Sequence, residues 1–135
     1  MPPQLRAANL PNPMSKIIIV DDSATMRSQV RQALTAGNFE LVEAIDGQDG
    51  LEKVNADPDI NVMILDVNMP RMNGIELAEA LSQNGRIAKG LKIVMLTTEG
   101  HADLIQRAKA AGAKGWIVKP FKPDLLLAAV QKMAA

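Results

Sequence analysis

Five polar side chains follow four apolar runs of the chain that we predict to be buried β-strands. Asp21 and Asp22 come after residues 16–20, Asp66 after residues 60–65, Thr97 after residues 91–96 and Lys119 after residues 116–118. In an open parallel sheet the carboxyl ends of the strands lie at one edge, where such sheets bind their ligands. We therefore expect these side chains to meet in one site that offers carboxylates, a hydroxyl and an ammonium group, which are groups that phosphoryl transfer uses.

Three carboxylates brought together repel one another, and a hard divalent cation with oxygen ligands, typically Mg²⁺, relieves that repulsion. Asp66 stands alone at the end of a central strand, so we predict that it is the nucleophile and forms an aspartyl phosphate. Asp21 and Asp22 are then placed to hold the cation directly or through water. Lys119 can pair with Asp66 at rest and with phosphoryl oxygen afterwards, and Thr97 can donate its hydroxyl to another oxygen.

Each of these positions, taken alone, also has a structural explanation. An aspartate after a strand is a frequent helix N-cap, so capping alone is an alternative for Asp22, which precedes Ser23. Thr97 and Lys119 in isolation fit ordinary loop and surface roles, and the single histidine, His101, fits a solvated surface position. The functional interpretation depends on the joint occurrence of these residues at four strand ends.

The composition describes one ordinary domain of 135 residues, 47% of them hydrophobic. Lys plus Arg and Asp plus Glu both number 15, and no basic run indicates a nucleic-acid or anionic-membrane partner. The absence of cysteine excludes disulfides and thiol chemistry. The apolar runs are too short for a membrane span. We expect a monomeric, soluble protein of the cytoplasm, with residues 1–14, which carry four prolines and no periodicity, as a flexible tail.

The apolar pattern predicts five strands that alternate with five helices. The expected strands are residues 16–20, 39–44, 60–65, 91–96 and 116–118. Asp46 is a predicted N-cap, Gly112 a predicted C-terminal cap and Pro123 a first-turn residue of the last helix. Because the strands are apolar on both faces, we expect an α/β fold with a parallel sheet covered on both sides. The known arrangement of this type is the flavodoxin-like, doubly wound (βα)5 sheet with strand order 2-1-3-4-5.

Several motifs of residues 15–135 resemble the receiver domain of two-component response regulators, and in particular the CheY-like single-domain regulators of chemotaxis. They occur in order and at the expected strand ends. The motifs are Val20-Asp21-Asp22-Ser23, Asp66-Val67-Asn68-Met69-Pro70 with Gly74, Thr97, and Gly115-Trp116-Ile117-Val118-Lys119-Pro120-Phe121.

The resemblance implies that Asp66 accepts a phosphoryl group from a histidine kinase. It further implies that Asp22, Asp66 and the backbone carbonyl of Asn68 are direct Mg²⁺ ligands, with Asp21 acting mainly through water. In the family, the residue at the place of Thr97 moves toward the phosphoryl group. An aromatic residue at the place of Trp116 rotates inward and remodels a protein-binding surface. For Trp116, an ordinary packed or interfacial side chain is the alternative.

In the family, the places of Asn68 and Glu99 tune hydrolysis of the aspartyl phosphate. The implied function is a phosphorylation-controlled switch that serves a chemotaxis-type kinase and docks on a flagellar motor switch protein or a phosphatase. A phosphorelay intermediate or phosphate sink without motor binding is the alternative.

Two further classes of protein compete with the switch. An aspartate-nucleophile phosphatase on a similar sheet needs a second acid two residues beyond the nucleophile, where this chain has Asn68 after Asp66 and Ser23 after Asp21. We therefore do not expect an enzyme beyond self-directed phosphotransfer and autodephosphorylation. A degenerate receiver used only for docking is disfavoured, because all the expected chemical groups are present.

Overall fold

The computed structural model describes residues 15–135, and within them five strands alternate with five α-helices. The prediction for residues 1–14 lies outside the described residues. The strands are β1 (Lys16–Val20), β2 (Glu40–Ala44), β3 (Ile60–Leu65), β4 (Lys92–Thr97) and β5 (Gly115–Val118). The helices are α2 (Ala24–Leu34), α3 (Gly47–Ala56), α4 (Gly74–Gln83), α5 (Ala102–Ala111) and α6 (Pro123–Ala134), with a 3₁₀ turn, η1 (Thr35–Gly37), after α2.

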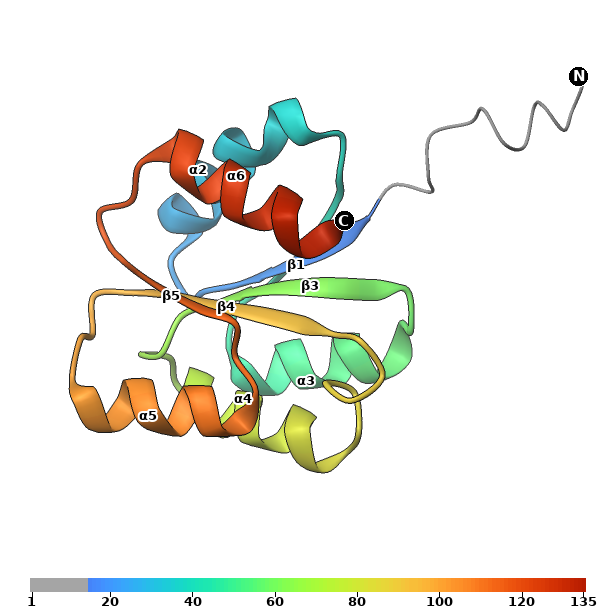
Figure 1. The fold of residues 1–135 in the computed structure, drawn as a ribbon, viewed down its shortest axis with the longest axis vertical. Helices are drawn as coiled ribbons and strands as arrows, with labels where there is room; N and C mark the ends of the chain where they lie inside the picture. Colours follow the sequence, from blue (N-terminus) through green and yellow to red (C-terminus); the bar gives the residue numbers. More distant parts are fainter. Residues whose placement is uncertain (1–14) are drawn as a thin grey trace, which may run out of the picture.

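The strands form one parallel sheet in the order β2-β1-β3-β4-β5, which confirms the predicted fold class and strand order. Figure 1 shows the sheet nearly edge-on between two layers of helices, with α2 and α6 on one face and α3, α4 and α5 on the other. A continuous apolar strand satisfies both layers at once, because successive side chains point to opposite faces. The three-layer architecture therefore follows from the apolar runs seen in the sequence.

Because side chains alternate between the two faces of the sheet, the protein has two apolar cores, one on each face. Ile18 and Val20 of β1 pack under α3, α4 and α5, whereas Ile17 and Ile19 pack under α2 and α6. All four side chains are buried. Fully burying a side chain of this size contributes about 1.5–3 kcal/mol. The central strands are therefore rigid supports for whatever follows them.

The predicted helix caps are confirmed. Asp46 accepts a hydrogen bond from the Asp49 amide as the N-cap of α3, and Gly112 ends α5 in the left-handed region with φ of 115°. Pro123 is the first residue of α6.

None of the helices between Ser15 and Ala135 combines the length and the apolar character that a membrane crossing needs.

Candidate functional site

The predicted site residues converge at the carboxyl edge of the sheet, and the strand register explains why. Val20 and Leu65 are paired across β1 and β3, so the residues that follow them, Asp21 and Asp66, lie side by side. The backbone amide of Asp66 still donates to the carbonyl of Val20 at 3.1 Å. The ends of β4 and β5 are held together in the same way, because the backbone amide of Lys119 donates to the carbonyl of Thr97 at 2.9 Å.

The three aspartates form an acidic cluster. One carboxylate oxygen from each of Asp21, Asp22 and Asp66 lies within 4.8 Å of the others. Asp21 and Asp66 are 4% and 6% exposed, while Asp22 is open to solvent. A cluster of oxygen donors with one open side fits a hard cation that retains water molecules, as Mg²⁺ does. These residues therefore fit the predicted metal.

Lys119 provides the positive charge of the site. Its ammonium lies 2.8 Å from a carboxylate oxygen of Asp21 and 3.5 Å from one of Asp66. The sequence predicts Asp66 as the resting partner of Lys119; in the structure Asp21 is the closer of the two acids, because neighbouring strand ends place both within reach of one side chain. A surface role for Lys119 is ruled out, since its side chain is only 11% exposed.

Burial raises the pKa of Asp66, because the charged form loses water. The nearby Thr97 hydroxyl and the charge of Lys119 lower the pKa of Asp66, and the charge of Asp21 raises it again. One Asp66 oxygen also accepts a hydrogen bond from the Val67 amide at 2.8 Å. The carboxylate is thus fixed in direction and poorly solvated, which suits a nucleophile that must attack in line.

Glu99 connects the remaining predicted residues. Its side chain accepts a hydrogen bond from the Asn68 amide group at 3.2 Å, and its backbone amide donates to the Thr97 hydroxyl oxygen at 3.3 Å. Its carbonyl accepts a hydrogen bond from the indole of Trp116 at 2.9 Å. The two residues expected to tune hydrolysis are therefore bonded to each other, and one of them is bonded to the expected switch residue.

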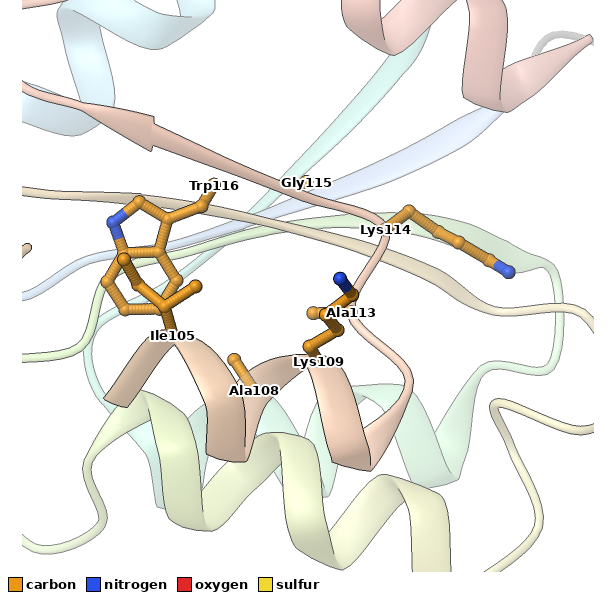
Figure 2. Close-up of a pocket in the computed structure, with 7 residues that line it drawn as sticks. All are labelled: Ile105, Ala108, Lys109, Ala113, Lys114, Gly115 and Trp116. Atoms are coloured by element: carbon orange, nitrogen blue, oxygen red, sulfur yellow. The ribbon is translucent and has the colours of Figure 1, made fainter. Parts of the chain in front are cut away.

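Trp116 lies half-buried on β5 against α5. Figure 2 shows its indole ring beside Ile105, with Ala108 on the same helix. These residues line a hollow of about 200 Å³ that also includes Ala113 and Gly115. The ring therefore has space beside it and one polar anchor, the Glu99 carbonyl.

Three structural interpretations from the sequence are now decided. Ser23, not Asp22, caps α2, because its hydroxyl oxygen accepts from the Met26 amide at 3.1 Å. Capping therefore does not explain Asp22. Thr97 is fully buried, so an ordinary loop role does not fit it either, while His101 is a solvated residue as expected.

Sequence reasoning missed two arginines that hold the loops of the site. Arg27 donates to the backbone carbonyl of Asp21 at 2.7 Å and to the Glu43 carboxylate at 3.0 Å. Arg71 makes two hydrogen bonds, of 2.7 and 3.0 Å, to the buried carboxylate of Asp46. Arg71 and Asp46 are 25 residues apart in the sequence, and no periodic pattern pairs residues at that separation. The only sequence signal for Arg71 is therefore its positive charge next to the Asn-Met-Pro segment.

Gly74 allows the loop after Asp66 to close on it, and its replacement by alanine should destabilise the fold. A Cβ atom at this position would lie 2.0 Å from the backbone oxygen of Asp66. Backbone must move to relieve this overlap, so we expect Gly74→Ala to lower the free energy of unfolding by about 3 kcal/mol. Gly100→Ala is the control, because within the described part of the chain no atom apart from those of its sequence neighbours lies within 4 Å of its Cβ position. Equal urea midpoints for the two variants would contradict the prediction.

Arg71 lowers the pKa of Asp46 below its ordinary value of 3.8, and the hydrogen bond from the Asp49 amide adds to this. A carboxylate with a lowered pKa stabilises the folded state above its ordinary pKa, and this stabilisation is lost as the pH falls through the lowered value. We expect the difference in free energy of unfolding between wild type and Asp46→Asn to be constant down to about pH 5 and to shrink below it. Urea unfolding across a pH series measures this; a difference that persists unchanged in acid would refute it.

A doubly wound (βα)5 sheet that carries an acidic cluster, a buried lysine and a buried threonine at its carboxyl edge defines the receiver class of signalling domains. Residues 17–131 match the family model of the response regulator receiver domain, and the chain belongs to this family. Receiver domains of this class are phosphorylation-activated switches rather than conventional enzymes.

The relatives are chemotaxis proteins. The chain is 40% identical over 112 residues to chemotaxis protein CheY1 of Helicobacter pylori, covering 82% of this chain and 90% of that protein. It is 36% identical over 121 residues to CheY of Thermotoga maritima, covering 88% and 97%. The structure matches CheY4 of Vibrio cholerae with a TM-score of 0.80 at 40% identity, covering 90% and 99%. A chain of the CheX–CheY–BeF₃–Mg²⁺ complex from Borrelia burgdorferi matches with a TM-score of 0.78 at 30% identity, covering 91% and 90%.

Proposed function

We propose that Asp66 is the phosphoacceptor of this CheY-like receiver and that residues 15–135 form its receiver domain. The observation that carries the proposal is the placement of a buried Asp66 carboxylate 3.5 Å from the Lys119 ammonium and within 4.8 Å of the Asp21 and Asp22 oxygens. This arrangement combines a desolvated nucleophile with fixed positive charge and a metal-binding cluster.

The transfer step forms a bond between an Asp66 oxygen and phosphorus while the bond from phosphorus to a kinase histidine nitrogen breaks. The electron pair of that bond leaves with the imidazole, and the product is an aspartyl phosphate. Lys119 then neutralises phosphoryl oxygen, and the Thr97 hydroxyl donates to another oxygen. In hydrolysis, water adds to phosphorus and the Asp66 carboxylate leaves, which releases inorganic phosphate.

We propose that Asp22, Asp66 and the Asn68 carbonyl hold Mg²⁺ directly and that Asp21 contributes through water. The cation would supply positive charge to offset the charge of the incoming phosphoryl group. Asp21 has a second task in the structure, because it holds the Lys119 ammonium at 2.8 Å. That ion pair supports an outer role for Asp21.

The switch would operate through Glu99. When Thr97 turns toward the phosphoryl group, it leaves the Glu99 amide that donates to it at 3.3 Å. The Glu99 backbone, which anchors the Trp116 indole, is then free to shift. Movement of Trp116 would remodel the surface formed by α5, β5 and α6, and partners would read that surface.

The chemotaxis relatives support a cytoplasmic role in which a chemotaxis-type histidine kinase phosphorylates Asp66 and the phosphorylated form binds a flagellar motor switch protein. The Borrelia burgdorferi CheX–CheY complex supports a CheX-like protein as a further partner. Pull-down with phosphorylated and unphosphorylated protein separates these partners from a phosphorelay role, in which only histidine phosphotransfer proteins would bind.

The test is phosphorylation of the full chain by a small phosphodonor with and without Mg²⁺, followed by intact mass and by Trp116 fluorescence. A Mg²⁺-dependent mass gain with a fluorescence change supports both acceptor and switch. A mass gain with silent fluorescence supports the acceptor and rejects Trp116 as the switch. Mg²⁺ binding without any mass gain rejects the phosphoacceptor.

We predict that the phosphorylated state is short-lived, because Asn68 and Glu99 lie at the mouth of the site and can orient an attacking water. The decay of the mass-shifted species in Mg²⁺, after removal of the phosphodonor, measures its lifetime. Persistence for many hours would contradict the prediction.

A further inference from the structure

The loop between Asp66 and α4 contains a strained turn. Arg71 has φ of 67°, in the left-handed region that residues other than glycine rarely adopt. The amide of Met72 donates to the carbonyl of Pro70 at 2.7 Å, which closes a three-residue turn around Arg71. A γ-turn with positive φ is rare and strained, and such backbone persists only where its surroundings hold it.

Residues at the junction of β2 and α3 hold this turn in place. The guanidinium of Arg71 makes its two hydrogen bonds to the carboxylate of Asp46, which is 4% exposed. The next residue of the loop is held as well, because the Gly47 amide donates to the Met72 carbonyl at 3.1 Å. This backbone contact is so close that a Cβ on Gly47 would lie 2.2 Å from the Met72 oxygen. Charge and shape therefore fix the turn together.

The same loop carries Asn68, three residues before Arg71, and the Asn68 side chain is bonded to Glu99 on the far side of the site. The loop is thus anchored at Asp46 beyond β2 and at Glu99 beyond β4, with the acidic cluster at the ends of β1 and β3 between them. Release of the Asp46 anchor would free the segment that contains Asn68.

We propose that Arg71 is a positioning residue whose ion pair with Asp46 holds the strained loop and thereby places Asn68 for cation binding. The inference rests on the proposed function in that it assigns Asn68 a role at the phosphorylation site. In this chain the buried carboxylate of Asp46, at the start of α3, fixes the loop that follows the acceptor Asp66.

The test measures Mg²⁺ affinity of the unphosphorylated full-length protein by titration calorimetry. Arg71→Asn removes the guanidinium while keeping a residue that tolerates the left-handed region. Asp46→Asn removes the charge but keeps a good N-cap for α3. We expect the Mg²⁺ dissociation constant to rise about tenfold in both variants, as is typical when a residue that orients metal ligands is lost. Arg71→Lys should recover part of the affinity, since an ammonium cannot make both hydrogen bonds.

Arg107→Gln is the matched control. Arg107 makes two hydrogen bonds to Glu79, and its side chain is 51% exposed against 58% for Arg71, but the pair joins α4 and α5 away from the acidic cluster. We expect this variant to leave the Mg²⁺ affinity unchanged. If Arg71→Asn and Asp46→Asn lower the melting temperature but bind Mg²⁺ as tightly as wild type, the pair is merely structural and the proposal is wrong.

Phosphorylation kinetics separate this proposal from the proposed function. We expect Arg71→Asn to need more Mg²⁺ for half-maximal phosphorylation while its rate at saturating Mg²⁺ stays within about twofold of wild type, since only the placement of the loop is disturbed. If wild type accepts no phosphoryl group, the proposed function fails, and the calorimetric comparison still decides the role of Arg71.

Discussion

Asp66→Asn is expected to abolish phosphorylation completely. An amide cannot act as the nucleophile that a carboxylate is. Of the other two carboxylates of the cluster, Asp21 is engaged by the Ser23 amide at 2.9 Å and by Lys119 at 2.8 Å, and Asp22 is open to solvent. The measurement is intact mass after incubation with a small phosphodonor and Mg²⁺. Asp103→Asn, an exposed change on α5, should be phosphorylated as wild type is.

The same variant should be more stable than wild type when Mg²⁺ is absent. Burial raises the pKa of Asp66, so the ionised carboxylate is less favourable in the folded protein than in the unfolded chain. For a carboxyl with a raised pKa, this cost is absent below its ordinary value of 3.8 and is complete above the raised pKa. We therefore expect Asp66→Asn to raise the melting temperature at neutral pH and to make little difference at pH values below the ordinary pKa.

Two results would contradict this view of Asp66. Continued mass gain in Asp66→Asn would place the acceptor elsewhere, with Asp21 and Asp22 as the nearest carboxylates. A lower melting temperature at neutral pH would mean that the contacts of the carboxylate outweigh the cost of its burial.

The sheet and the convergence of the site could be predicted because they depend on patterns that the chain carries locally. Apolar runs such as residues 60–65 define strands, and parallel strands bring Asp21, Asp66 and Lys119 to one edge whatever the details of the loops. The ends of the helices are less determined by such patterns. After α2 the chain continues as a 3₁₀ turn over Thr35–Gly37, which ends at Asn38 with φ of 57°.

The pairing of side chains within the site could not be predicted. Lys119 has two acids within reach, and the choice of Asp21 at 2.8 Å over Asp66 at 3.5 Å depends on side-chain conformations that no sequence period encodes. The Arg71–Asp46 pair depends on a strained turn, and nothing local favours positive φ at an arginine. These are tertiary effects, and they concern the loops rather than the sheet.

The second large effect is expected at Lys119. In Lys119→Met the carboxylates of Asp21 and Asp66 lose the ammonium that lies between them, and removal of one partner from a buried charge pair typically costs 3–5 kcal/mol. We expect the free energy of unfolding in the absence of Mg²⁺ to fall by about 3 kcal/mol, measured by urea denaturation at neutral pH.

Mg²⁺ should restore much of this loss, because a cation bound by the same carboxylates replaces the missing charge and a ligand of the folded state stabilises it by mass action. The melting temperature of Lys119→Met should therefore rise more with Mg²⁺ than that of wild type. Lys92→Met is the control. Lys92 is also partly buried, and among residues 15–135 its ammonium donates to the Met133 carbonyl at 2.8 Å and forms no ion pair, so its loss should cost about 1 kcal/mol and leave the Mg²⁺ response unchanged. If Lys119→Met and Lys92→Met respond to Mg²⁺ alike, the ammonium of Lys119 does not balance the charge of the acidic cluster.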